Sequence, residues 1–173
     1  MGISFGALLT PAPRFVAAAS VRFNSRLRAS TVDTATRVAL PLEVSFGAYY
    51  QPVAGILATV AVGYAGWSTA SGALVAAGDS ATRNVWSVGA GVEAAALRVG
   101  GNLLPLRVGY RWRQLPFPIG GSPLTEHAVS GGLGFSTASG RAEVDVAIEG
   151  GSRTAGALSE TFTTAYLGLT IRP

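Results

Sequence analysis

Apolar residues alternate with polar or small residues along most of this chain, with a period of two. In the stretch GILATVAVGYAGW, residues 55–67, Ile56, Val60, Val62 and Tyr64 are at even positions, whereas the odd positions from 59 to 65 hold threonine, alanine and glycine. Successive side chains of a β-strand point to opposite faces of a sheet, so this period predicts strands. The pattern recurs in residues 15–26, 37–50, 85–94, 105–113, 127–135, 141–150 and 165–172.

The spacing of these segments predicts about nine strands in meander order and no helix. Segments rich in Gly, Pro, Ser, Thr and Asn separate them and predict turns and loops, the longest being 24–36, 68–84 and 150–160. Each predicted strand has roughly nine to fourteen residues, whereas strands of globular sheets most often have about five or six. A tilted strand needs about nine to eleven residues to cross a bilayer. The lengths therefore favour a membrane-spanning sheet.

A transmembrane helix is the alternative over residues 46–78, which contain no charged residue. Five glycines interrupt this run, Pro52 divides it, and its large apolar residues are mostly Val, Tyr and Trp rather than Leu. Because the period within it is two, we interpret it as strands rather than as a helix.

Composition changes the interpretation of the two faces. The chain is 49% hydrophobic and 13% charged, about half the usual charged fraction, and all thirteen of its basic residues are arginine. Soluble β-proteins place many charged residues on their wet face, whereas here that face is mostly Gly, Ser and Ala. In an outer-membrane barrel the apolar row faces lipid and the polar row faces the lumen. The sequence thus predicts a lipid-facing girdle of aromatic residues near strand ends: Phe15, Phe23, Tyr50, Tyr64, Trp86 and Trp112. Ordinary core packing in a soluble barrel stays open as the alternative.

The stretch LPLRVGYRWRQLPF, residues 104–117, places arginines on one face of a strand and Leu, Val, Tyr and Trp on the other. If 127–135 is the next strand and 141–150 the one after it, the middle strand adds only serine and glycine to the polar face. Long side chains on the outer two strands could then meet above a glycine floor, although strand register cannot be determined from sequence. The predicted lumen charge network comprises Arg107, Arg111, Arg113, Glu93, Glu143, Asp145 and Glu149. Solvated charges without specific pairing are the alternative.

The order of these segments resembles the FadL family of outer-membrane transporters for long-chain fatty acids and other hydrophobic compounds. The similar text is LPLEVSFGAYYQP, then GYAGWS, LPLRVGYRWRQLPF, HAVSGGLGF, RAEVDVAIEGGSR and AYLGLTIR, which together span residues 40–172. The resemblance implies an N-terminal hatch inside a fourteen-stranded barrel, but neither the hatch nor the leading strands can be found here. No ligand-binding residue is therefore carried over from the family.

Taken together, residues 1–173 are predicted to be all-β: one antiparallel up-and-down transmembrane β-barrel of about eight to ten strands, or the C-terminal part of a larger one. We expect uptake of long-chain fatty acids or other hydrophobic molecules in the bacterial outer membrane. The expected partners are membrane lipid, a hydrophobic small molecule and the outer-membrane assembly machinery. A small structural barrel without transport and a soluble lipid-binding barrel are the competing interpretations. No secretory signal is visible, so for an exported protein we expect a leader upstream of Met1.

The sequence gives little support for catalysis, metal binding or nucleic-acid binding. The net charge is +4, but the arginines are scattered rather than clustered, so no nucleic-acid partner is predicted. The only histidine, His127, is three residues from Ser130, and two residues three apart on one strand point to opposite faces. They cannot form a catalytic dyad, and a single histidine without cysteine cannot build a typical zinc site. We therefore predict no enzymatic activity, no metal and no cofactor.

Overall fold

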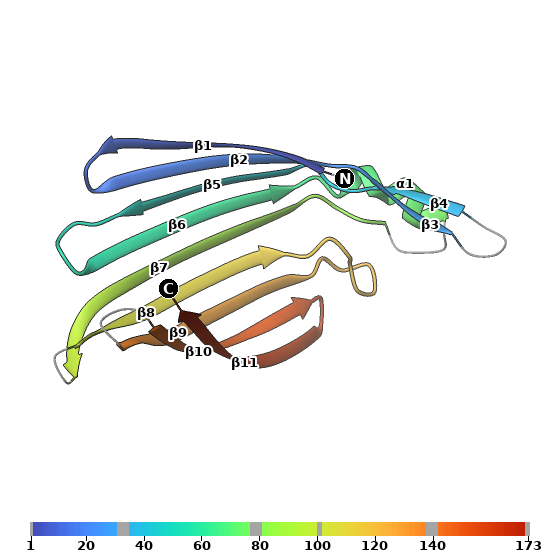
Figure 1. The fold of residues 1–173 in the computed structure, drawn as a ribbon. Coiled ribbons are helices and arrows are strands. Elements are labelled where there is room, and N and C mark those ends of the chain that lie inside the picture. The colour runs from blue at the N-terminus through green and yellow to red at the C-terminus, as the bar shows by residue number, and fades with distance from the viewer. Residues whose placement is uncertain (1, 31–34, 77–80, 100–101, 138–141, 172–173) are drawn as a thin grey trace.

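The chain folds into one curved sheet of nine antiparallel strands, extended at one end by a two-stranded hairpin and a short helix (Figure 1). The computed structural model describes residues 2–30, 35–76, 81–99, 102–137 and 142–171. The elements are β1 Gly2–Ala12, β2 Phe15–Asn24, β3 Arg26–Ser30, β4 Ala35–Ala39, β5 Glu43–Tyr50, β6 Ile56–Ala65, α1 Ser68–Ala76, β7 Val85–Val99, β8 Asn102–Gln114, β9 Thr125–Thr137, β10 Ala142–Ala155 and β11 Leu158–Ile171.

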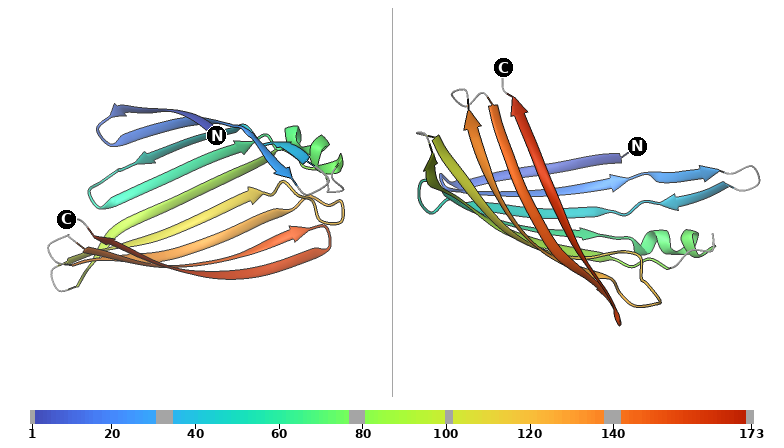
Figure 2. Two further views of the ribbon diagram at one scale, coloured as in Figure 1. Left: turned by 45° about the vertical axis from the view of Figure 1, so that its right-hand side comes forward. Right: turned by 90° about the horizontal axis from the view of Figure 1, so that it is seen from below.

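The strand order of the large sheet is β1-β2-β5-β6-β7-β8-β9-β10-β11, so its strands pair in the order in which they follow one another along the chain. Strands β3 and β4, between β2 and β5 in the sequence, form the separate hairpin. The predicted all-β, antiparallel up-and-down arrangement of about nine strands is confirmed. The sheet does not close into a barrel, however, because β1 and β11 are its two edges (Figure 2). In an antiparallel sheet of nine strands the first and last run in the same direction, so these two edges cannot join as an antiparallel pair.

The two ends of the sheet differ in their connections. At one end, which we call the long-loop rim, lie the described residues 25–30, 35–42, 66–76, 81–84 and 115–124 and the turn 156–157. At the other end, the short-turn rim, lie residues 13–14 and 51–55, together with the end of β7, the start of β8, the end of β9 and the start of β10. The hairpin β3–β4 and helix α1 both belong to the long-loop rim (Figure 1).

Two segments predicted as loops contain strands, so these predictions were wrong. Residues 24–36 include β3 and the start of β4, because alternating residues allow Leu27 to pair with Val38. The segment 150–160 is mostly strand, since Gly156 adopts a positive φ of 60° and reverses the chain in two residues. The predicted strand 37–50 is divided at residues 40–42, around the buried Pro41.

Helix α1 was also missed, because its Ser, Thr and Gly are typical of loops. Tertiary contacts hold this Ala-rich turn in place: Ala70 is fully buried, Thr82 Oγ1 donates to the carbonyl of Trp67 at 2.7 Å, and the helix packs against β4. The Trp67 ring also lies 6.0 Å from that of Phe117 in the β8–β9 connection. Within the described parts of the chain, no helix is long and apolar enough to cross a membrane.

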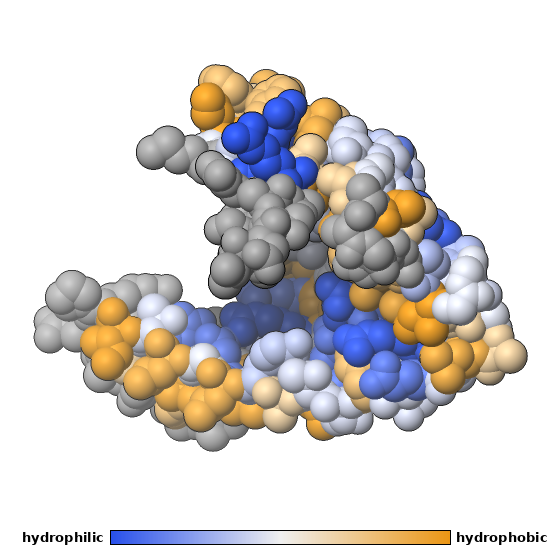
Figure 3. Space-filling view, turned by 90° about the vertical axis from the view of Figure 1, so that its right-hand side faces the viewer, coloured by the Kyte–Doolittle hydropathy of each residue, from blue (hydrophilic) through white to orange (hydrophobic). Residues whose placement is uncertain are grey.

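The sheet is a single layer and has almost no hydrophobic core. Among the described residues, the buried hydrophobic side chains are only Ala70, Val85, Ala128 and Ala155. The large apolar side chains instead cover the convex face, where Val108 is 61% exposed, Ile148 58% and Leu167 79%. Figure 3, a view onto one end of the sheet, shows a C-shaped wall with hydrophilic residues gathered in its hollow and hydrophobic residues along much of the outside.

Candidate functional site: the charged concave face

Strand register brings the predicted charged residues to the concave face. Glu93 on β7 is opposite Arg107 on β8, which is opposite Gly132 on β9, and Gly132 is opposite Ala147 on β10. Because side chains alternate, odd positions of β7, β8 and β10 share this face with even positions of β9. All seven residues of the predicted charge network lie on it: Glu93, Arg107, Arg111, Arg113, Glu143, Asp145 and Glu149.

Arg107 is the centre of the first cluster, nearer the short-turn rim. Its Nε donates to Glu93 Oε2 on the adjacent strand at 2.6 Å. Its Nη1 donates to Asp145 Oδ1, and its Nη2 lies 3.7 Å from Glu143 Oε1, both on β10, two strands away. One arginine therefore joins three strands, and three carboxylates share its single positive charge.

A glycine floor on β9 allows these contacts to cross the middle strand. A Cβ atom on Gly134 would lie 2.8 Å from Asp145 Oδ1 and 3.1 Å from Pro105 Cγ. On Gly132 it would lie 2.9 Å from the Cβ of Ala147. A side chain at position 134 would occupy the space that the Arg107–Asp145 ion pair now uses, and one at position 132 would collide with Ala147 on β10. The predicted pairing above small residues is therefore present in the structure.

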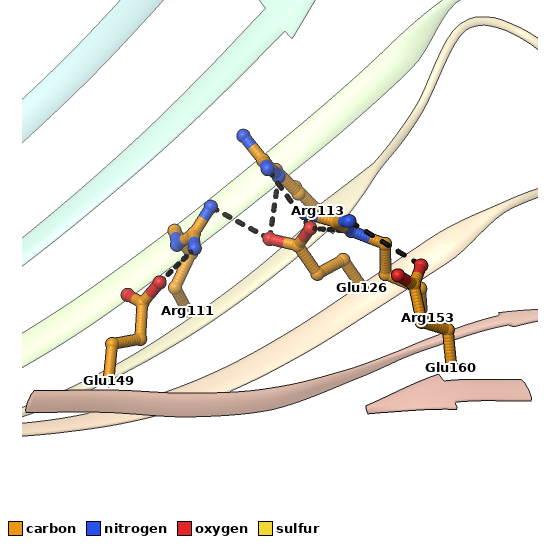
Figure 4. Close-up of polar contacts among 6 residues, drawn as sticks. All are labelled: Arg111, Arg113, Glu126, Glu149, Arg153 and Glu160. Atoms are coloured by element: carbon orange, nitrogen blue, oxygen red, sulfur yellow. Dashed lines mark hydrogen bonds and ion pairs between the residues drawn. The ribbon is translucent and has the colours of Figure 1, made fainter. Parts of the chain in front are cut away.

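Glu126 is the centre of a second cluster, nearer the long-loop rim (Figure 4). Its side chain is only 1% exposed, and three guanidiniums surround it. Arg111 Nη1 lies 2.9 Å from Oε1, Arg113 Nη2 donates to Oε2 at 3.0 Å, and Arg153 Nε donates to Oε2 at 2.6 Å. A carboxylate this buried is stabilised only by such charged hydrogen bonds.

The outer carboxylates of this cluster complete its charge balance. Arg111 Nη2 donates to Glu149 Oε1 at 2.7 Å, again across β9. Arg153 Nη1 lies 3.5 Å from Glu160 Oε2 on β11, and its guanidinium carbon lies 4.7 Å from the centre of the Phe162 ring. Three arginines and three glutamates thus form one continuous neutral network from β8 to β11.

The structure corrects part of the predicted pairing. Arg113 contacts Glu126 on β9 rather than the acidic row of β10, because register places the two directly opposite each other. Sequence analysis did not assign a network role to Glu126 or Arg153. Glu126 has the same parity as Ser130 on the polar face of β9, and that alternation was the signal that could have identified it.

The remaining half of the concave face, on β1, β2, β5 and β6, is nearly uncharged. Its ion pair, Arg22 Nη1 to Glu43 Oε2 at 3.4 Å, is exposed at the long-loop rim, where Asn24 also donates to Glu43. Between this half and the charged half lies an open depression of about 330 Å³, lined mostly by small residues of β6 and β7 together with Tyr110, Arg111 and Glu149. The concave face is therefore nearly uncharged and lined mostly by small side chains on β1, β2, β5 and β6, and it carries paired charges on β7–β11.

The six predicted aromatic residues all lie on the convex face, by the same alternation. Phe23, Tyr64, Trp86 and Trp112 are near the long-loop rim, whereas Phe15 and Tyr50 are cross-strand partners at the short-turn rim. Tyr64 and Trp86 pair across β6 and β7, with ring centres 4.9 Å apart. The strand ends thus carry aromatic residues at both rims.

The arrangement offers no obvious reaction centre. His127 lies on the convex face, where the Tyr110 hydroxyl and His127 Nδ1 are 2.7 Å apart, whereas Ser130 belongs to the concave face. No group of three potential metal-ligating side chains occurs in the part of the chain that the structure describes. What the concave face provides is a fixed set of paired charges.

We compared the sequence with protein-family models and with curated proteins. No protein-family model matches the chain, and no curated protein matches it. The functional conclusion therefore rests on the residues and their arrangement.

Proposed function

We propose that this chain forms wall strands of a bacterial outer-membrane β-barrel that takes up long-chain fatty acids or other hydrophobic molecules. The observation that carries the proposal is the apolar convex face of a single-layer sheet. Monomeric soluble proteins rarely expose contiguous apolar patches larger than a few hundred Å². Here exposed Val, Leu, Ile, Phe, Tyr and Trp side chains extend over all nine strands of the sheet, and none of the described elements forms a second layer over them.

Strand length supports a transmembrane position. Strands β7–β11 have 13 to 15 residues. At about 3.3 Å per residue they extend roughly 43–50 Å, and a tilt of about 45° reduces their height to some 30–35 Å. The hydrocarbon core of a bilayer is about 30 Å thick.

The two rims also support a transmembrane position of the sheet, and they indicate which of its ends faces the cell exterior. Aromatic residues at both strand ends match the interfacial girdles of outer-membrane barrels. Such barrels also have longer extracellular loops and short periplasmic turns. We therefore assign the long-loop rim, with β3–β4 and α1, to the extracellular side.

Barrel closure in this proposal needs further strands. Because β1 and β11 run in the same direction, an antiparallel barrel closes only if an odd number of strands lies between them. A second copy inserted in the same orientation would again place its β1 parallel to β11. Additional strands of a larger barrel satisfy the direction rule, in keeping with the resemblance to the FadL family.

The concave face supports passage of a molecule that is mostly apolar. Its ionic residues are paired with one another, so they stabilise the wall across strands β7–β11. The side formed by β1, β2, β5 and β6 presents mainly Gly, Ala, Ser, Val and Leu toward the hollow. An acyl chain could pass along this side without displacing a charge pair.

Membrane insertion is tested by refolding the product of the complete gene, which would supply the strands that close the barrel, into phosphatidylcholine vesicles. Quenching by brominated acyl chains is measured in variants whose only tryptophan is Trp67, Trp86 or Trp112. We expect quenching of Trp86 and Trp112 from the lipid side, and little quenching of Trp67, which packs in the long-loop rim. Equal, weak quenching at all three positions, with a fully water-soluble product, would refute the membrane assignment.

Transport is tested separately, in cells that carry the complete gene and in cells without it. We expect faster uptake of a radiolabelled long-chain fatty acid in the cells that carry the gene. Normal insertion with no difference in uptake would instead support a structural barrel.

A further inference from the structure

The convex face of strands β9–β11 changes character near the long-loop rim. Toward the short-turn rim it carries mainly Val, Leu, Ile and Phe, as on the rest of the sheet. Near the long-loop rim, the alternation that places Glu126, Arg153 and Glu160 on the concave face brings hydroxyl and imidazole groups to the convex face instead. We call these residues the hydroxyl patch: Thr125, His127, Ser152, Thr154, Ser159 and Thr161.

Strand register makes the hydroxyl patch one continuous surface. His127 on β9 is directly opposite Ser152 on β10, which is opposite Thr161 on β11. A second row, two residues nearer the rim, repeats the pattern with Thr125, Thr154 and Ser159. The patch thus crosses three neighbouring strands, and it contains neither an arginine nor a carboxylate.

Only part of the hydrogen-bonding capacity of the patch is used within the protein. The Oγ1 atoms of Thr125 and Thr154 are 3.1 Å apart. The exposed hydroxyls of Ser159 and Thr161 have no hydrogen-bond partner within the described part of the chain. Each such hydroxyl can donate one hydrogen bond and accept two. Because an unpaired hydroxyl is unfavourable in hydrocarbon, a polar partner is expected at this surface if it lies in the membrane.

The height of the patch in the proposed orientation indicates which part of the membrane it meets. Trp112, one of the aromatic residues of the long-loop rim, is directly opposite His127. Strands are about 4.8 Å apart, so a tilt of about 45° moves each further strand by roughly 3.4 Å along the membrane normal. Thr161 is three strand spacings from Trp112 and therefore within roughly 10 Å of its height. The patch thus lies in or beside the layer of lipid headgroups.

Below the patch the same face offers aromatic and apolar surface. The exposed Tyr110 lies at the edge of the patch, where its hydroxyl is 2.7 Å from His127 Nδ1. Gly131 separates the exposed side chains of Val108 and Ile148, and a Cβ atom on it would have no atom within 4 Å. A molecule at this position would meet hydroxyls on the rim side and an apolar notch on the membrane side.

We propose that the hydroxyl patch binds the uncharged saccharide headgroup of a glycolipid in the leaflet at the long-loop rim, with an acyl chain of that lipid beside Gly131. This inference rests on the proposed membrane position of the sheet. Saccharide hydroxyls both donate and accept hydrogen bonds, as Ser and Thr do. The apolar faces of sugar rings also pack against aromatic rings, which Trp112 and Tyr110 supply. A phosphate headgroup would instead call for guanidinium or ammonium partners, and the patch has none.

The test is native mass spectrometry of the product of the complete gene, in a polyoxyethylene detergent that carries no sugar. The probes are digalactosyl diacylglycerol, diacylglycerol and phosphatidylethanolamine with the same acyl chains, and the free disaccharide. S159A/T161V removes two hydroxyls of β11, whereas S159T/T161S retains them. Thr164→Val is the matched control, because it removes a hydroxyl from the concave face of the same strand. A gel run with and without boiling establishes that each variant is folded.

We expect the wild-type protein and Thr164→Val to bind the galactolipid equally, and more tightly than diacylglycerol or phosphatidylethanolamine. S159A/T161V should lose roughly ten-fold in affinity, which corresponds to about 1.4 kcal/mol for two hydrogen bonds. S159T/T161S should stay within about two-fold of the wild type, since both hydroxyls remain.

Undiminished affinity in S159A/T161V, or equal binding of the three lipids, would overturn the proposal. Full competition by the free disaccharide would also overturn it, by indicating a site for soluble sugar. A dimer that S159A/T161V abolishes, without galactolipid binding, would indicate a second copy on the patch and would overturn it as well. If the protein inserts into vesicles and yet shows one of these results, only this inference fails, and the proposed function stands.

Discussion

Replacing Glu126 by glutamine should destabilise the folded chain far more than any other single loss of a carboxylate. Glu126 is 1% exposed and contacts Arg111, Arg113 and Arg153 at 2.6–3.0 Å. Glutamine retains one oxygen acceptor, but it removes the charge and directs two N–H donors toward the guanidiniums. The local network changes from three positive and three negative charges to a net charge of +1.

The magnitude follows from burial. Breaking a fully buried ion pair by removing one partner costs about 3–5 kcal/mol. The three arginines retain 33–39% of their side-chain exposure, so water screens part of the unbalanced charge. We therefore expect Glu126→Gln to lower the free energy of unfolding by about 2–3 kcal/mol.

The assay is urea-induced unfolding of the chain in detergent micelles, followed by tryptophan fluorescence. The matched control is Glu160→Gln in the same network, because Glu160 is 64% exposed and 3.5 Å from Arg153. An exposed pair of this kind contributes at most about 1 kcal/mol. Equal losses in the two variants would show that burial does not determine the strength of the network, and the reasoning would be wrong.

Three further predictions use the same unfolding assay. Gly134→Val should lower the free energy of unfolding by about 2–3 kcal/mol, because the new side chain overpacks the site and displaces the Asp145 carboxylate. Gly131→Val is the control and should be neutral, because Gly131 faces open space on the other side of the sheet. A similar loss at both glycines would argue against the glycine floor. Val108→Arg on the convex face should cost about 2–4 kcal/mol when the same urea titration is run in phospholipid vesicles instead of micelles. Thr59→Arg on the concave face should cost less than about 1 kcal/mol there, and the reverse order would place lipid on the wrong face. Arg22→Gln should change stability by less than about 1 kcal/mol, since its pair is exposed, and a larger loss would contradict that reading.

The sequence predicted most of the strands and the face of each residue, because the period of two is a local property of the backbone. In LPLRVGYRWRQLPF that period alone separates Arg107, Arg111 and Arg113 from Val108, Tyr110 and Trp112. Among the regular structures that the sequence did not predict, α1 and β3–β4 lie where tertiary contacts outweigh weak local preference. Ser71 and Trp67 accept hydrogen bonds from Thr82, and helix α1 lies against β4.

Partner choice within the charge network depended on register, which a strand's own residues do not determine. Arg113 meets Glu126 because β8 and β9 pair with those two residues opposite each other, and a shift of two residues would bring Arg113 opposite Ala128 instead. The sequence by itself thus determined which residues share the concave face and that charged and apolar residues are segregated. Only the tertiary structure decided which arginine meets which carboxylate and which glycines leave room for the contact. It also decided that the nine strands form an open sheet, because ion-pair geometry and the direction of edge strands arise between segments rather than within them.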